Sequence, residues 1–272
     1  MDWKKNAGTS GVPLACIKQS LTKVSLWETT VFPRCIVDLF TGPRRPVLRE
    51  WGDMSDDIVF AIFVYDDVEP IDLGATFGVL SMARRIAPGI KVFTVGREKG
   101  RLRLTNGLTI LAEYGFADCP DMDVLIVSGG PGWIDQAEMP GVLAFVKRMK
   151  SRAVVVSVCT GAMILAAAGV LDGRRATTKR RAAVDEISPL QTLRGGYPKV
   201  DVVESRLVDD GDVITGGGVT LAIDMMLHLL QRFLGSSVAN ETARIMEYET
   251  AWFANGVAFG KNAETETSVK RI

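Results

Sequence analysis

Cys159 is the residue whose surroundings point most clearly to chemistry. It follows the apolar run 153–158, and the small-residue segment 160–170, with the spacing of a helix, begins directly after it. Ser157 and Gly161 are small, as a nucleophile elbow requires, because its central residue sits in a strained turn. Exposed N–H groups at a helix start stabilise a thiolate, so we expect a pKa below about 8.5. The alternative is a buried cysteine that packs as a small hydrophobic side chain.

Two further segments carry groups that can work with a cysteine. Residues 128–132 read Ser-Gly-Gly-Pro-Gly after an apolar run, and glycines there let backbone N–H groups approach a ligand, as in an oxyanion hole. A plain loop is the alternative. Asp72 follows the first apolar run and can act as a general acid or base, although it can equally cap the next helix. All three segments end predicted strands, so we expect them at one edge of a sheet.

The elements that must position these residues alternate along the chain from residue 57. The patterns predict a hairpin at 102–112 and strands at 58–65, 90–95, 124–128, 153–158, 175–178, 200–208 and 212–215. They predict helices at 73–84, 141–149, 160–170, 180–187, 219–233 and 237–248. Nearly all-apolar strands that alternate with helices indicate an α/β domain. Its sheet is doubly wound and mostly parallel, with helices on both faces, as in flavodoxin-like folds.

The organised pattern covers only part of the chain. Residues 1–53 are punctuated by Gly and Pro and show neither a convincing strand nor a helical period. We interpret them as a poorly structured extension or as sequence upstream of a true start at Met54. The predicted domain spans 54–250, and 251–272 form a C-terminal tail.

Composition excludes several classes of function. The chain has 32 basic and 32 acidic residues, which gives no broad attraction to nucleic acid or to an anionic membrane. Four cysteines without a C-x-x-C pair and a single histidine do not form a zinc cluster, so we expect no metal. Free thiols indicate a reducing compartment, and no run approaches the ~20 apolar residues of a membrane span. We therefore expect a cytoplasmic protein.

Together these motifs resemble the ThiJ/PfpI branch of the class I glutamine-amidotransferase-like superfamily over roughly 57–250. The likeness rests on Pro-Ile-Asp-Leu at 70–73, Gly-Gly-Pro-Gly at 129–132, Val-Cys-Thr-Gly at 158–161, the run from Ala166 to Thr178, and Thr-Gly-Gly-Gly at 215–218. Within the superfamily the chain is most similar to the isonitrile hydratase group, which the segment 243–248 also resembles.

The resemblance implies a reaction and a set of site residues. Cys159 would attack the carbon of an isonitrile, Asp72 would manage the proton, and water would release an N-substituted formamide. Thr160 would position the reacting groups, and the N–H groups of Gly130 and Thr160 would stabilise developing charge. The family likeness further implies a small-molecule substrate, no metal or organic cofactor, and a homodimer.

One position departs from the family pattern. Many relatives have histidine directly after Ala-Thr-Thr, where this chain has Lys179. Lys179 can lower the thiol pKa by its charge, or it can be one of several cations on a solvated face. His228 lies in the middle of a predicted helix and offers no obvious replacement. The expected function is hydration of a small electrophile by a hydro-lyase. The alternative is a non-catalytic redox-sensing or ligand-binding domain.

Overall fold

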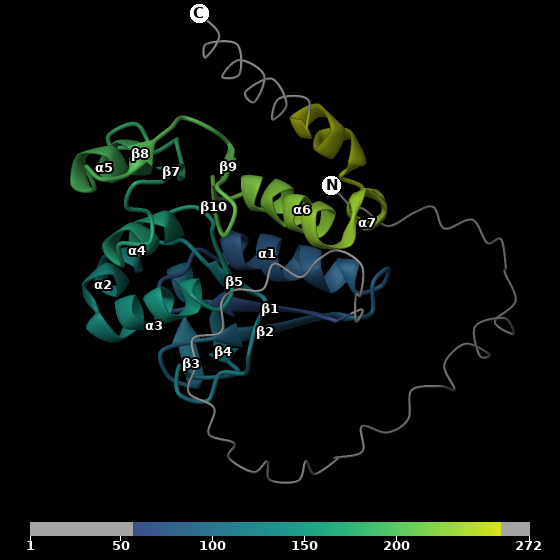
Figure 1. Cartoon of the computed structure of the whole chain (residues 1–272), viewed down its shortest axis with the longest axis horizontal. Coiled ribbons are helices and arrows are strands. Elements are labelled where there is room, and N and C mark those ends of the chain that lie inside the picture. Colours follow the sequence, from purple (N-terminus) through teal and green to yellow (C-terminus); the bar gives the residue numbers. More distant parts are fainter. Residues whose placement is uncertain (1–56, 257–272) are drawn as a thin grey trace, which may run out of the picture. The chain divides into compact units, whose positions relative to one another are not determined.

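A six-stranded sheet forms the centre of the protein in the computed structural model, which describes residues 57–256 (Figure 1). The strand order is β2-β1-β5-β6-β10-β9, in which only the edge strand β9 runs antiparallel to its neighbour. The strands are β1 (Ile58–Phe63), β2 (Ile90–Val95), β5 (Val124–Val127), β6 (Val154–Ser157), β9 (Leu207–Asp209) and β10 (Val213–Gly216). The predicted extension of residues 1–53 lies outside the described part of the chain.

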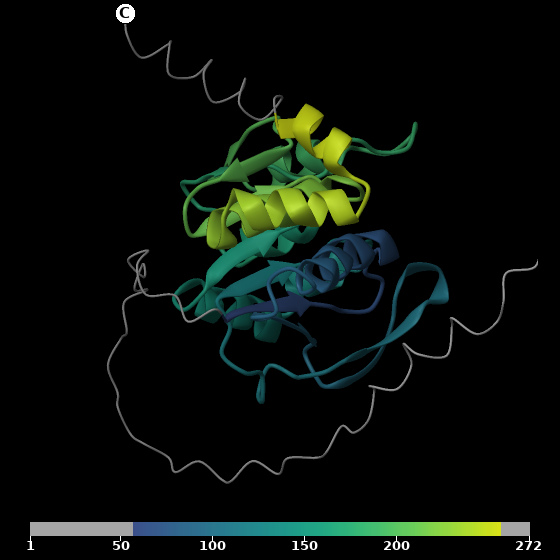
Figure 2. The same ribbon diagram turned by 90° about the vertical axis from the view of Figure 1, so that its right-hand side faces the viewer.

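Helices cover both faces of this sheet because its strands are apolar on both sides. In β1, Phe60 and Ile62 face one core while Ala61 and Phe63 face the other, as the two-residue period of a strand requires. One core is covered by α1 (Pro70–Ala83), α6 (Leu221–Leu234) and α7 (Ser236–Ile245), and α1 and α6 lie side by side (Figure 2). The other is covered by α2 (Trp133–Glu138), α3 (Pro140–Lys150) and α4 (Gly161–Ala167). The predicted α/β fold is confirmed.

Two small sheets complete the fold. The predicted hairpin consists of β3 (Gly100–Arg103) and β4 (Thr109–Ala112), which are joined across η2 (Thr105–Gly107). The second small sheet is a parallel pair, β7 (Arg175–Ala176) and β8 (Asp201–Val202), in which β7 contacts β10. No helix within residues 57–256 is long and apolar enough to cross a bilayer.

The structure corrects three sequence-based expectations. Residues 180–187 are not helical, and the helix there is α5 (Pro189–Gly196), because Pro189 is suited to a first helical position and Ser188 makes a capping box with Gln191. Asp72 does not cap α1, which begins at Pro70, so Asp72 lies inside the first turn. The boundary expected at residue 250 falls within a helix of residues 249–256 (yellow in Figure 1).

Candidate active site

Cys159 occupies the turn between β6 and α4 in a strained conformation. Its φ is 52°, in the left-handed region that non-glycine residues rarely adopt, and the residue is 4% exposed. Gly161 is required beside it, because a Cβ there would come closer than 3.0 Å to the carbonyl oxygen of Val127. The Thr178 hydroxyl donates to the Cys159 carbonyl at 2.6 Å. The turn therefore has the geometry of the predicted elbow.

Asp72 faces this cysteine from the first turn of α1 and is fully buried. Its Oδ1 accepts a hydrogen bond from the Val219 N–H at 2.6 Å, whereas its Oδ2 has no hydrogen-bond partner among the described residues. A Cβ on Gly129 would come closer than 3.0 Å to both Asp72 Oδ2 and the Cβ of Cys159. The carboxyl and the thiol therefore converge on one point, which is open only because residue 129 is glycine.

The electrostatics of the pair differ from the expectation drawn from the sequence. Burial, followed by the negative charge of Asp72, raises the pKa of the Cys159 thiol, and the Thr160 N–H and Lys179 offset only part of this. Burial likewise raises the pKa of Asp72, against the opposing effect of the Val219 N–H. The predicted low thiol pKa is therefore wrong, because the helix terminus lies in a buried site beside a carboxyl group. The pair instead retains a proton.

The loop after β10 forms the remaining wall of the site. A Cβ on Gly218 would lie closer than 3.0 Å to the Cα, Cβ and Sγ of Cys159. Val219 follows with φ 62°, and its N–H is the one that holds Asp72. Sequence reasoning used this glycine run only as a family likeness. Its place at the end of a predicted strand was the signal that could have assigned it to the site.

Thr160 and Gly130 hold the loops of the site together, which changes one expected role. The Gly130 N–H donates to Thr160 Oγ1 at 2.8 Å, and the Thr160 hydroxyl contacts the Gly130 carbonyl oxygen at 3.2 Å. The Gly130 N–H is thus occupied and is not free to stabilise an oxyanion in this structure. The Thr160 N–H does face the Cys159 sulfur, where it lowers the pKa of the thiol.

Tyr65 is a buried neighbour of the site that sequence reasoning missed. Its hydroxyl donates to the Ser128 carbonyl at 2.8 Å, which fixes the start of the Gly129–Gly132 loop. Burial, followed by Cys159 and Asp72, raises the pKa of Tyr65 well above its usual value, so its hydroxyl keeps its proton. Its position two residues after β1 was the available signal.

The chain is similar to known proteins over most of the described domain. The model of the DJ-1/PfpI family matches residues 58–232, which include every site residue described above. The chain belongs to the DJ-1/PfpI family. An isonitrile hydratase from Pseudomonas putida is 35% identical over 199 residues, which cover 73% of this chain and 81% of the hydratase. A crystal structure of a ThiJ/PfpI family protein from Pseudomonas syringae shares 28% identity and a TM-score of 0.62, covering 80% of this chain and 83% of that one.

The chain is also similar to proteins with other functions. The transcriptional regulator CdhR of Pseudomonas aeruginosa is 28% identical over 141 residues, which cover 52% of this chain and 40% of the regulator. The likeness to this regulator therefore concerns less than half of its length. Family membership establishes the DJ-1/PfpI fold, whereas the activity depends on the side chains of the site.

Lys179 and His228 occupy different places in this DJ-1/PfpI domain. Lys179 is half-buried next to Thr178, and its charge lowers the pKa of both Asp72 and Cys159, although for each it is the smallest of the contributions. His228 lies on α6 and pairs with Asp209 of β9 at 2.8 Å. The single histidine of the chain thus has a partner on the edge strand.

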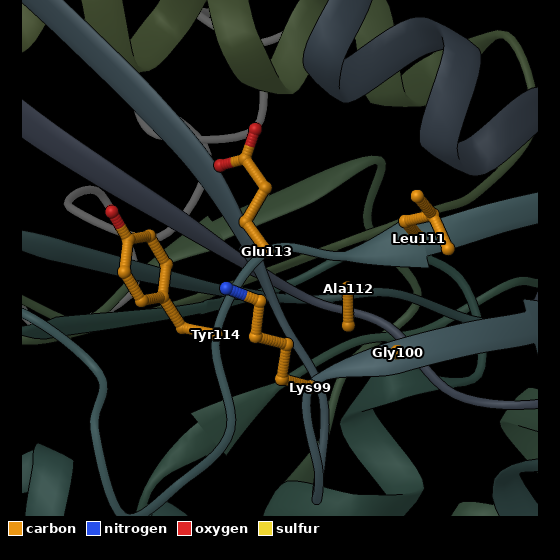
Figure 3. A pocket seen from close by; sticks show the side chains of 6 residues that line it. All are labelled: Lys99, Gly100, Leu111, Ala112, Glu113 and Tyr114. Carbon is orange, nitrogen blue, oxygen red and sulfur yellow. The ribbon is translucent and has the colours of Figure 1, made fainter. Parts of the chain in front are cut away.

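A surface cavity lies elsewhere on the domain, at the β3–β4 hairpin. It is lined by Lys99, Gly100 and residues 111–114, with the side chains of Lys99, Glu113 and Tyr114 around it (Figure 3). None of these residues belongs to the loops that form the cysteine site. Within residues 57–256, no group of three or more His, Cys, Asp or Glu side chains is placed to hold a metal ion.

Enlarging Gly218 tests the close approach of this loop to the thiol. Gly218→Ala should destabilise the domain by about 1–3 kcal/mol, because its Cβ would overlap Cys159. Gly195→Ala is the matched control, since nothing lies within 4 Å of a Cβ there and alanine favours the helix α5. Urea unfolding of both variants measures the difference. Equal stability of the two would contradict the described packing.

Removing the Asp72 charge tests the coupling of the pair. Asp72→Asn should lower the pKa of the Cys159 thiol, because the carboxylate charge is one of the causes that raise it. Iodoacetamide labelling across pH, read for each peptide by mass spectrometry, should therefore rise at lower pH than in the wild type. Cys119 is the internal control, because its pKa, raised to about 11, depends on burial and Asp118 instead. An unchanged Cys159 curve would show that the two groups are not coupled.

Proposed function

We propose that the protein is a hydro-lyase that adds water to a small electrophile, with an isonitrile as substrate and an N-substituted formamide as product. The observation that carries this proposal is the buried Cys159–Asp72 pair, in which a nucleophile and a proton donor face one small space. The 35% identity to an isonitrile hydratase supports the choice of substrate. No metal or organic cofactor takes part in the proposed reaction.

The first step uses the proton that the pair retains. The isonitrile carbon carries a lone pair and also accepts a nucleophile, so it needs one proton and one thiolate. The proton passes from the Cys159 thiol through Asp72 to that carbon while the Cys159 sulfur bonds to the same atom, which gives a thioimidate, R–N=CH–S, on the enzyme. Asp72 is left as a carboxylate. The Thr160 N–H, which faces the sulfur, stabilises the thiolate before attack.

The second step releases the product and restores the proton. The Asp72 carboxylate takes a proton from water as the water oxygen adds to the thioimidate carbon, and it passes that proton to nitrogen. The C–S bond then breaks, and the hydroxyl proton returns to the Cys159–Asp72 pair as the carbonyl forms. The product R–NH–CHO contains every atom of the isonitrile and of one water molecule, and the pair has regained its single proton.

The position of the single histidine argues against cysteine–histidine chemistry. A protease or amidotransferase of that type needs an imidazole beside the thiol to act as base. His228 instead pairs with Asp209 on the edge strand. Lys179 occupies the position after Ala-Thr-Thr where many relatives have histidine. A carboxyl group is therefore the proton-transfer group of the proposed mechanism.

A ligand-binding or redox-sensing role is the second candidate. The raised pKa of the buried Cys159 thiol leaves little thiolate at neutral pH in the resting protein, which favours the ligand-binding role, since oxidation as well as nucleophilic attack needs the thiolate. Matches to transcriptional regulators add support at the level of the domain. This candidate predicts ligand binding without turnover, so one assay separates the two.

A formamide-release assay on a panel of small isonitriles tests the proposed activity. The wild type should turn over at least one of them, and Cys159→Ala and Asp72→Asn should each lose activity by about a thousandfold or more. The double variant should be no worse than either single variant, because the two residues act as a unit. Near wild-type turnover by Asp72→Asn would remove Asp72 from the mechanism. No turnover by the wild type on any isonitrile would favour the binding role.

We further propose that the protein is a cytoplasmic homodimer. An apolar groove supports a second copy as partner; it runs along α1 and is lined by Ile71, Gly74, Ala75, Gly78, Val79, Met82, Ile223 and Met246. Ile71 is 43% exposed there, and nothing lies within 4 Å of a Cβ on Gly74 or Gly78. Contact between two such grooves would bury apolar surface that one chain leaves in water.

Light scattering tests the dimer and its interface together. At micromolar concentration the wild type should give about twice the 29.5 kDa chain mass. Gly78→Glu should give the single-chain mass, because it puts a charge in the groove at a position with room for a side chain. A monomeric wild type across dilutions would exclude the dimer, and a dimeric Gly78→Glu would place the interface elsewhere.

A further inference from the structure

Val219 has a backbone conformation that its own side chain disfavours. A β-branched residue at φ 62° is strained and persists only where its surroundings hold it. Its strained peptide is the one that donates to Asp72 Oδ1. The geometry of the Asp72 carboxyl therefore depends on whatever keeps Val219 in place.

A chain of contacts leads from Val219 to the helix of residues 249–256. The Gly217 N–H, two residues before Val219, donates to the Arg206 carbonyl at 2.9 Å. The Arg206 guanidinium donates to Asn255 Oδ1. Asn255 Nδ2 in turn donates to Asp224 Oδ2 of α6 at 2.9 Å. Asn255 thus ties the segment that supports the Gly217–Val219 turn to a buried carboxyl of α6.

The chemistry of the neighbours fixes the orientation of the Asn255 amide. Arg206 can only donate hydrogen bonds, so the amide oxygen must face it, and the amide nitrogen is then left to donate to Asp224. Asp224 is 1% exposed and needs such donors, of which Asn255 makes the shorter contact and Tyr248 the longer, at 3.4 Å. The amide therefore bridges the two groups in one direction only.

The Val219 N–H determines which oxygen of Asp72 carries a proton. An oxygen that accepts an N–H hydrogen bond is the poorer site for a proton, so a proton that Asp72 takes up binds to Oδ2. Oδ2 is the oxygen that shares the space beside Gly129 with Cys159. The turn therefore directs the Asp72 proton toward the position where a substrate would meet the thiol.

We propose that Asn255 is a positioning residue of the active site, which acts through Arg206 and the Gly217–Val219 turn to direct protonation of Asp72 to the oxygen that faces Cys159. This inference rests on the proposed function in that it takes the Cys159–Asp72 pair as the reacting centre. It concerns a property of Asp72 that can be measured without any substrate.

The titration of Asp72 reports on the position of Val219. The charged or titratable groups that act on Asp72 are Glu69 on its own loop, Cys159, Lys179 and the neighbouring Tyr65, and none of them is changed by a substitution at residue 255. Withdrawal of the Val219 N–H removes a hydrogen bond to the carboxylate form. The pKa of Asp72 must then rise, because the charged form loses stabilisation.

The experiment is a ¹³C NMR titration of the aspartate carboxyl groups, with the Asp72 signal assigned by its absence in Asp72→Asn. Asn255→Ala should raise the pKa of Asp72 by roughly 0.5–1 unit, as partial loss of one backbone hydrogen bond implies. Arg206→Met removes the Arg206–Asn255 hydrogen bond from the other side and should give the same shift. It tests the proposal independently if Asn255→Ala does not fold. The double variant should show no further shift, because both changes break one link.

Asn240→Ala, on α7, is the matched control, because it removes a different contact of the helix of residues 249–256. Asn240 accepts the Trp252 N–H at 3.0 Å, so this variant loosens the helix of residues 249–256 without touching Arg206, and the Asp72 titration should stay as in the wild type. An unshifted Asp72 in folded Asn255→Ala and Arg206→Met would overturn the proposal, as would an equal shift in Asn240→Ala. The formamide assay has no part in this readout, so the proposal can fail while the proposed function stands, and the reverse.

Discussion

A carboxyl group buried against a thiol at one edge of the sheet is the constraint on which the site depends. Neither Asp72 nor Cys159 can carry its charge cheaply there, because both are removed from water and each negative charge opposes the other. The pair avoids this cost by retaining a proton between its two members. The Val219 N–H donates to the one carboxylate, and Gly129 and Gly218 leave the space beside the two groups free of a Cβ.

This constraint explains why glycines surround the site. Gly129, Gly161 and Gly218 each lie where a Cβ would come closer than 3.0 Å to the backbone or side chain of the elbow and its supports. They come from loops after β5, β6 and β10, which lie side by side in the sheet. The parallel order of these strands brings their carboxyl ends together, and the missing side chains let the loops meet there. The parallel sheet thus forms the site by bringing the backbones of these three loops close together.

The sequence was sufficient for the fold and for the place where Cys159 and Asp72 meet. Buried parallel strands have nearly continuous apolar runs, so the strands and the edge where Cys159 and Asp72 meet could be derived from local pattern. The helix predicted at 180–187 shows the limit of local pattern. The helix in this region is α5, which begins at Pro189 after the Ser188 cap. The contact between Val219 and Asp72 spans 147 residues, and no local pattern encodes it.

The direction in which the pKa of the Cys159 thiol shifts was the property that the sequence predicted least well. A cysteine at a helix start usually has a low pKa because N–H groups face it, and the Thr160 N–H does so here. Burial and the Asp72 carboxylate outweigh this contribution, and both depend on tertiary packing. A nucleophile held as a thiol beside a carboxyl suits a substrate whose reacting atom needs a proton and a sulfur together. A carbonyl group would need them on two different atoms, so one proton shared by the Cys159–Asp72 pair fits an isonitrile carbon better.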